Sequence, residues 1–142
     1  MKTVFLRVLE ADVANKAAAL RAAIHAPQEA AGRRRFEVVL MNPPSGAGSL
    51  AAKKELAQSY PRTKNDLYAA FVERGIQLLH PRGMLGAITS RTGFFLSSFQ
   101  KWREEILLKE APPVVFADLG YDVLDSAMVE VAAYCLRKEA RA

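Results

Sequence analysis

The chain has 142 residues, of which 51% are hydrophobic and 25% are charged, the balance of one soluble globular domain rather than of a disordered or fibrous protein. Its apolar runs fall well short of the roughly 20 residues that cross a bilayer, and its start lacks the pattern of a secretion signal. We therefore expect a cytoplasmic protein with no membrane partner. The single cysteine and two histidines have no spacing typical of disulfides or a metal site. A net charge of +5 permits a polyanionic partner without demanding one.

Residues 1–35 are predicted to form an N-terminal helix followed by a basic loop. Apolar residues, among them Phe5, Leu9 and Leu20, recur at helical spacing between alanines, which favour helix. Pro27 and Gly32 interrupt this pattern and indicate a loop over about residues 26–35. The rest of the chain, residues 36–142, is expected to form the main domain.

In residues 36–142, predicted strands alternate with predicted helices. Thr63 with Asp66, and Ser97 with Gln100, are spaced as capping boxes at the start of two helices. Alternation of this kind predicts an α/β fold with a mostly parallel sheet and helices on both faces. Short apolar runs predict the strands, and helical spacing the helices, at 36–41, 50–59, 63–79, 84–89, 97–107, 114–116 and 129–136.

Ligands of parallel α/β sheets bind beyond the carboxyl ends of the strands, which directs attention to Asn42-Pro43-Pro44. Each proline fixes its own backbone torsion and supplies no N–H donor. The Asn42 amide oxygen and the Pro43 carbonyl oxygen are then two preset acceptors, which match the two hydrogens of an exocyclic amino group. A merely rigid turn is the alternative interpretation of this tripeptide.

Three segments resemble one family of enzymes. Residues 36–44, FEVVLMNPP, resemble the Asn-Pro-Pro-aromatic motif of amino-methylating DNA methyltransferases. Residues 65–90, NDLYAAFVERGIQLLHPRGMLGAITS, and 94–107, FFLSSFQKWREEIL, are similar to the elements that follow it in adenine-specific (N6) enzymes of bacterial restriction-modification and phage-exclusion (BREX-type) systems. The resemblance covers about residues 36–136. It implies a partial Rossmann-like class I methyltransferase sheet that lacks its first strands, the target-binding half of a catalytic domain.

The resemblance also implies a reaction, the transfer of a methyl group from S-adenosylmethionine to N6 of an adenine flipped out of DNA. Asn42, Pro43 and Pro44 would form the catalytic corner that holds the N6 amino group. DNA is the implied partner. The substrate-binding residues expected around this corner, beyond the ends of the strands, are Ser45, Ser90, Arg91, Phe94 and Tyr121.

Two features depart from the family pattern. Ser45 stands where the family has an aromatic residue that stacks on the flipped base. Phe94 or Phe95 is a candidate to supply that aromatic face, and the alternative is that these two residues anchor the core or the loop. The glycine-rich turn and acidic residue that bind the cofactor in the family have no counterpart ahead of Phe36. The cofactor-binding residues are therefore unknown, and we expect a complementing half to supply them.

Two other functions stay open. A catalytically inactive methyltransferase-like module would use its basic face to bind DNA or a protein partner. An unrelated small α/β protein would bury Asn42 away from any cleft. If the strand ending at Met41 lacks a neighbour on its other side, its exposed edge would also favour a homodimer.

Overall fold

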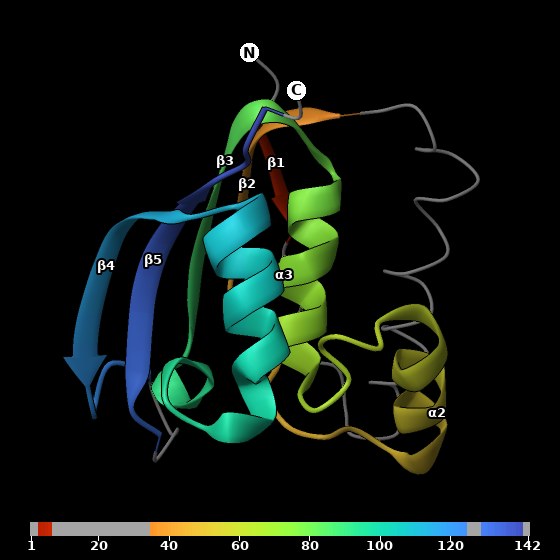
Figure 1. Cartoon of the computed structure of the whole chain (residues 1–142). Helices are drawn as coiled ribbons and strands as arrows, with labels where there is room; N and C mark the ends of the chain where they lie inside the picture. The colour runs from red at the N-terminus through yellow and green to blue at the C-terminus, as the bar shows by residue number, and fades with distance from the viewer. Residues whose placement is uncertain (1–2, 7–34, 125–128, 141–142) are drawn as a thin grey trace.

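The computed structural model of the chain describes residues 3–6, 35–124 and 129–140 (Figure 1). Its centre is a five-stranded sheet with the order β1-β2-β3-β5-β4. The strands are β1 (Thr3–Leu6), β2 (Phe36–Met41), β3 (Leu79–Ser90), β4 (Pro113–Gly120) and β5 (Val131–Arg137). The helices are α2 (Leu50–Ser59), α3 (Leu67–Gln77), the short 3-10 turns η2 (Arg91–Phe94) and η3 (Ser97–Phe99), and η4 (Trp102–Glu110), which is wound as a π-helix.

The sheet is mixed because one strand runs against the others. β1, β2 and β3 pair in parallel, whereas β5 lies antiparallel between β3 and β4. β4 therefore points the same way as β1, β2 and β3, and the carboxyl ends of these four strands meet at one edge of the sheet, which we call the carboxyl edge. This arrangement confirms the predicted α/β class and a partial Rossmann-like sheet.

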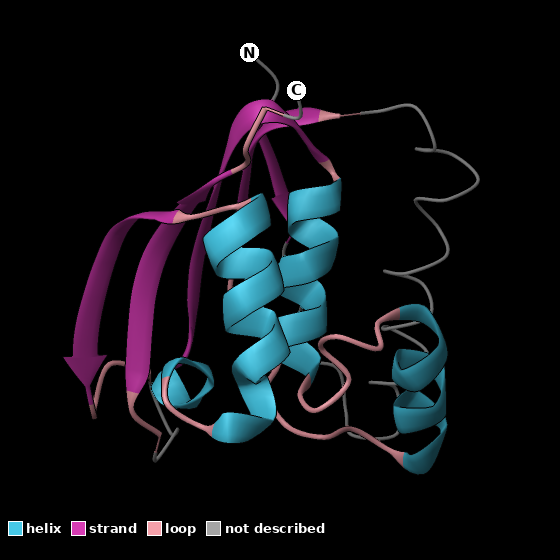
Figure 2. Ribbon diagram, in the orientation of Figure 1, coloured by secondary structure: helices cyan, strands magenta, loops and turns pink. Residues whose placement is uncertain are grey.

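Helices α3 and η4 pack side by side on one face of the sheet (Figures 1 and 2). Gly75 of α3 lies so close to β2 and β3 that a Cβ atom there would be 2.5 Å from the side chains of Met41 and Leu85. The Trp102 ring of η4 lies 6.4 Å from the Tyr134 ring of β5. Register places Met41, Leu85 and Tyr134 on this same face of the sheet, where the core forms.

The strand β2 departs from the prediction of burial on both faces. Val39 and Met41 are buried, but Leu40 between them is 41% exposed. The apolar run Phe36–Met41 is continuous in the sequence, yet one face of the strand is buried and the other is partly exposed. The helices of the described part of the chain cover the face of Val39 and Met41. We predicted helices on both faces of the sheet, and the helices of the described residues confirm this for one face.

The N-terminal prediction was wrong for residues 3–6. These residues form β1, which pairs in parallel with β2 from Thr3↔Val38 to Leu6↔Met41. A contiguous run of β-branched, aromatic and aliphatic side chains favours a strand once a partner edge is present, and the helical spacing to Leu9 was misleading. The remainder of the predicted helix and basic loop lies outside the described residues. Because β1 covers β2, the expected free edge beside Met41 is also absent from the described sheet, and the edge strand on the far side is β4.

Helix starts differ from the predicted capping boxes. Helix α2 spans residues 50–59 as predicted, with the Ser49 side chain accepting from the Ala52 N–H. Helix α3 starts later than predicted, because Asp66 is its N-cap and Thr63 instead donates to Glu73 at 2.7 Å. Ser97 begins the short turn η3, which has no side-chain cap. The capping-box spacing of Thr63 with Asp66, and of Ser97 with Gln100, therefore did not predict where these two helices begin.

Candidate functional site

The strand order brings two of the predicted loops together at the carboxyl edge. Met41 pairs with Ala87 in the adjacent strand, so Asn42 and Ser90 follow neighbouring strands. Tyr121 follows β4, which is three strand positions from β2, roughly 14 Å at the usual strand spacing. Tyr121 is 61% exposed and lies on the same edge of the sheet, but not beside Asn42.

The Asn42 corner, residues 42–45, exposes two of its polar residues. Asn42 and Ser45 are exposed, Pro44 is half-buried and Pro43 is buried. In the described part of the chain, neither the Asn42 carboxamide nor the Pro43 carbonyl has a hydrogen-bond partner. The buried Pro43 anchors the corner, while the Asn42 carboxamide stays exposed. The binding of an amino group by the two acceptors stays a prediction.

The loop after this corner is held by the start of α3. The Gly46 N–H donates to both carboxylate oxygens of Asp66, at 2.9 and 3.1 Å, and the Gly46 carbonyl accepts from the Leu67 N–H at 2.9 Å. Gly46 has a φ of +105°, a conformation that glycine adopts without strain. Asp66 thus fixes the loop and caps the helix through the Tyr68 N–H with one side chain.

Burial shifts the pKa of the carboxyl group in this clamp. Desolvation raises the pKa of the Asp66 carboxyl above its ordinary value, and the hydrogen bonds from the Tyr68 and Gly46 N–H groups oppose that shift. The sequence analysis did not assign Asp66 to the site. The sequence predicted Asp66 as part of a capping box with Thr63, whereas its contact with Gly46 depends on the fold.

The second loop of the edge, residues 91–96, is fixed from two sides. Arg103 Nη1 donates to the carbonyl oxygens of Gly93 and Leu96, each at 2.7 Å. Gly93 packs so closely that a Cβ atom there would lie 2.7 Å from the Trp102 ring. Asn65 Nδ2 donates to the Ser98 carbonyl at 2.5 Å, which connects the start of α3 to the turn η3 directly after this loop. Both loops of the carboxyl edge are therefore fastened to the same end of α3.

Ser90 and Phe94 have contacts within the protein that explain them without a ligand. The Ser90 hydroxyl caps η2 by accepting from the Thr92 N–H at 3.3 Å. The Phe94 ring meets the rings of Trp102, Phe116 and Tyr134 at centroid distances of 5.2, 4.8 and 5.2 Å. A role in substrate binding stays a prediction for both residues.

Arg91 is paired with two acids. Its guanidinium lies 2.7 Å from Asp118 and 2.7 Å from Glu130, and the hydrogen bond to Asp118 is the largest cause that raises the pKa of Arg91. A cation that two carboxylates already compensate has little charge left for a phosphate. The structure therefore favours Arg91 as a tie between the loop after β3 and the strands β4 and β5, and its predicted contact with substrate stays a prediction.

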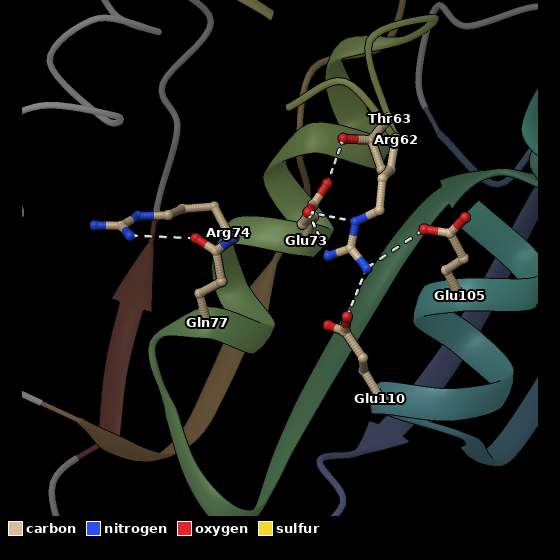
Figure 3. Close-up of polar contacts among 7 residues, drawn as sticks. All are labelled: Arg62, Thr63, Glu73, Arg74, Gln77, Glu105 and Glu110. Atoms are coloured by element: carbon tan, nitrogen blue, oxygen red, sulfur yellow. Dashed lines mark hydrogen bonds and ion pairs between the residues drawn. The ribbon is translucent and has the colours of Figure 1, made fainter. Parts of the chain in front are cut away.

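Sequence reasoning missed a second polar cluster, which we call the Arg62 cluster and which consists of Arg62, Thr63, Glu73, Glu105 and Glu110 (Figure 3). Arg62 lies 2.6 Å from Glu73 of α3 and 2.5 Å from Glu110 at the end of η4. Glu105 is more distant, at 3.8 Å. Arg62 is 11 positions from Glu73 and 48 positions from Glu110 in the sequence, so no local spacing could reveal the cluster. It joins α3 and η4.

The described residues do not fit the cofactor that the resemblance implies. Its glycine-rich turn would have to offer free backbone N–H groups, but the Gly46 N–H is bound by Asp66. Of the acids near the carboxyl edge, Asp66 caps α3 and Asp118 pairs with Arg91. Residues 3–6, 35–124 and 129–140 also include no group of three or more potential metal ligands, and none of their helices is long and apolar enough to span a membrane.

A family model, that of the Eco57I restriction-modification methylase, matches residues 5–122 of the chain. The chain belongs to this family. Adenine-specific methyltransferase PglX of Lacticaseibacillus casei is 30% identical over 110 residues, which are 73% of the chain and 9% of that protein. Adenine-specific methyltransferase BrxX of Escherichia coli is 26% identical over 143 residues, which are 96% of the chain and 12% of that protein. The chain thus spans about a tenth of these relatives.

Solved structures agree with the Eco57I-family assignment at the level of the fold. A class I S-adenosylmethionine-dependent methyltransferase from Listeria monocytogenes has a TM-score of 0.59 at 21% identity, covering 75% of the chain and 33% of that protein. DrdV, solved in complex with DNA, has a TM-score of 0.61 at 15% identity, and the match covers 78% of the chain and 14% of DrdV. The M protein of the type I restriction enzyme EcoKI has a TM-score of 0.58 at 14% identity, and the match covers 79% of the chain and 23% of the M protein. The predicted class I methyltransferase fold is therefore confirmed.

Proposed function

We propose that this Eco57I-family chain supplies the target-binding half of a DNA methyltransferase that methylates N6 of adenine. The observation that carries the proposal is the Asn42 corner, where an exposed carboxamide and the adjacent Pro43 carbonyl lack partners in the described part of the chain. The neighbouring loop is meanwhile held by Asp66. The adenine-specific relatives and the DNA-bound structural neighbour support adenine and DNA as the targets.

The two acceptors match the chemistry of an aromatic amine. The N6 amino group has two hydrogens, and one hydrogen bond to each acceptor would fix its orientation. The nitrogen lone pair could then point at an electrophilic methyl group, and positioning of this kind accounts for a large part of the rate of such a transfer. Inside a duplex the amino group is stacked and out of reach, so the base must first be flipped out.

The methyl group would come from S-adenosylmethionine, as the methyltransferase family implies. Because the described residues do not fit that cofactor, we propose that a different part of the protein or a complementing chain holds it. The described residues would bind and orient the base. Calorimetric titration of this chain with S-adenosylmethionine is expected to show weak or no binding, whereas micromolar binding would contradict a separate cofactor half.

The experiment that tests the function is a transfer assay with labelled S-adenosylmethionine and DNA. The chain is expressed together with the cofactor-binding segment of an adenine-specific relative, as wild type, as Asn42→Ala and as Ser45→Tyr. The matched control is Gln58→Ala, which removes an exposed carboxamide from helix α2. We expect label on adenine N6 with the wild type and the control, more label with Ser45→Tyr, and at least about a 100-fold loss with Asn42→Ala.

A catalytically inactive module that binds DNA or a protein partner is the second candidate. Ser45 favours it, because an exposed serine cannot stack on a base as an aromatic ring does. DNA binding by the chain without transferred label, persisting in the Ser45→Tyr variant, would support the module and contradict the enzyme. A homodimer and a cytoplasmic location stay predictions.

A further inference from the structure

The turn after β3, at the carboxyl edge of the sheet, exposes two large apolar side chains. Phe95 is 65% exposed and Leu96 is 51% exposed. The ring of the preceding residue, Phe94, instead packs among the rings of the core. One of two consecutive phenylalanines therefore anchors the turn, and the other points away from the core, although burying it would be favourable.

The exposure of Phe95 is built into a fixed backbone. The Phe95 and Leu96 N–H groups both donate to the Thr92 carbonyl, at 3.1 and 2.9 Å. Arg103 holds the Leu96 carbonyl at 2.7 Å. The ring is thus presented by a turn that is ordered on both sides, so little further ordering is needed when a ligand binds.

One face of the Phe95 ring is already occupied by a cation. The Arg91 guanidinium carbon lies 5.5 Å from the ring centroid, a cation–π arrangement. Arg91 is held in this place by Asp118 and Glu130. The ring is 65% exposed and has no aromatic neighbour in the described part of the chain, so it has free surface for a flat partner.

Two exposed lysines flank the hydrogen bond that connects the start of α3 to η3, and their charge favours a nucleic acid as the partner. Lys64 and Lys101 are exposed and have no ion pair in the described part of the chain. Lys64 precedes Asn65, whose side chain is bound to the Ser98 carbonyl, and Lys101 follows three residues after Ser98. These two lysines are available to phosphates, whereas Arg91 is compensated. An apolar ring beside free cations matches a base and its phosphates.

We propose that Phe95 is a stacking platform for an unstacked nucleobase of the bound nucleic acid, with Arg91 supporting the ring from behind. This platform lies in the loop after β3, whereas Ser45 belongs to the Asn42 corner after β2. This inference rests on the proposed function for its partner, DNA, but it makes no use of methyl transfer. It predicts that the chain distinguishes a strand that carries a base from one that lacks it.

The test is a fluorescence anisotropy titration of the 142-residue chain with two labelled single strands. One is a short oligonucleotide with a central adenine, and the other is the same strand with an abasic site at that position, which keeps the phosphates and removes the base. The wild type is expected to bind the first about tenfold more tightly, in the range measured for stacking on aromatic residues. Phe95→Leu should abolish this preference, and Phe95→Tyr should keep it.

Leu108→Ala is the control, because Leu108 is 68% exposed on η4 and its loss should change neither affinity. Phe95→Leu keeping the full preference would overturn the proposal, and so would equal binding of both strands by the wild type. Failure of binding to any oligonucleotide would overturn it in favour of a protein partner. The transfer assay with Asn42→Ala tests the proposed function separately, because that assay measures methyl transfer, whereas the titration measures the base preference that is lost in Phe95→Leu.

Discussion

The Arg62 cluster and the Asn42 corner use polar side chains in opposite ways. Arg62 meets Glu73 and Glu110 at 2.6 and 2.5 Å, and Thr63 donates to the same Glu73 carboxylate. Asn42 lies exposed, without a hydrogen-bond partner in the described part of the chain. Side chains that bind one another hold helices together, whereas the one left unpaired is held in place only through its backbone.

The difference shows how a rigid site is left open. The Asn42 corner is fixed by the burial of Pro43 and by the hydrogen bonds from the Gly46 N–H to the Asp66 carboxylate. None of these contacts uses the Asn42 carboxamide. A substitution in the Arg62 cluster should therefore change stability, and a substitution at Asn42 should change binding alone. The free energy of unfolding, measured with urea, ranks the variants below.

Arg62→Met is expected to have the largest effect on stability. Glu73 is only 6% exposed, and removing its cation leaves a buried carboxylate that Thr63 alone satisfies. We expect a loss of about 2 to 3 kcal/mol in the free energy of unfolding. Arg91→Met is the matched control, since both partners of Arg91 are far more exposed, and it should have a much smaller effect. Equal losses in the two variants would contradict the comparison.

Asp66→Ala is expected to come second. The variant loses the N-cap of α3 and the clamp on Gly46 together, and loss of an N-cap costs about 1 kcal/mol. Asp66→Asn keeps an oxygen that can accept from the same N–H groups, so it should retain most of the stability. An alanine variant as stable as the asparagine variant would show that these hydrogen bonds contribute nothing.

The pH dependence of the same carboxyl should be smaller and of defined sign. Burial raises the pKa of Asp66 above its ordinary value of 3.8, so the folded chain binds this proton more tightly than the unfolded chain does. The contribution of Asp66 to stability therefore becomes more favourable as the pH falls through the raised pKa, and less favourable as it rises. The measured quantity is the free energy of unfolding of the wild type minus that of Asp66→Asn. This difference should increase as the pH is lowered from 7 to 4, roughly the range in which a carboxyl with a raised pKa titrates. A decrease would contradict the assigned cause.

Asn42→Ala should have the smallest effect on unfolding. An exposed side chain without partners contributes within about 0.5 kcal/mol to stability. Its large expected effect is on methyl transfer. Destabilisation by more than about 1 kcal/mol would mean that the carboxamide holds the corner together, and the proposed function would lose its main support.

The sequence predicted the elements around the core well and the ends of the chain less well. Residues 36–41 and 50–59 form the predicted strand and helix, because a short apolar run and a polar stretch between loop signals are determined locally. Residues 3–6 were predicted as helix and form β1, since pairing with β2 outweighs a weak helical spacing. The antiparallel direction of β5 was likewise invisible, because strand direction is set by tertiary pairing.

For the candidate site, the sequence predicted which loops follow the strands at the carboxyl edge, but it did not predict the contacts within these loops. Asn42 followed from a motif that is local. The clamp between Asp66 and Gly46 spans 20 residues, and the tie between Arg91 and Asp118 spans 27. Spacing in the sequence carries no information about such pairs. The opposite fates of Phe94 and Phe95 depend on which way the turn faces, which only the fold decides.

The position of β5 has a consequence for how the chain folds as it is synthesised. β4 is made before β5, yet β5 is its sole strand partner in the described sheet and separates it from β3. When β4 leaves the ribosome, the three parallel strands can already assemble, but β4 must wait as an unpaired apolar segment until residue 137 has been translated. During that interval Val115 and Phe116, still about half exposed in the finished fold, are open to association with other nascent chains.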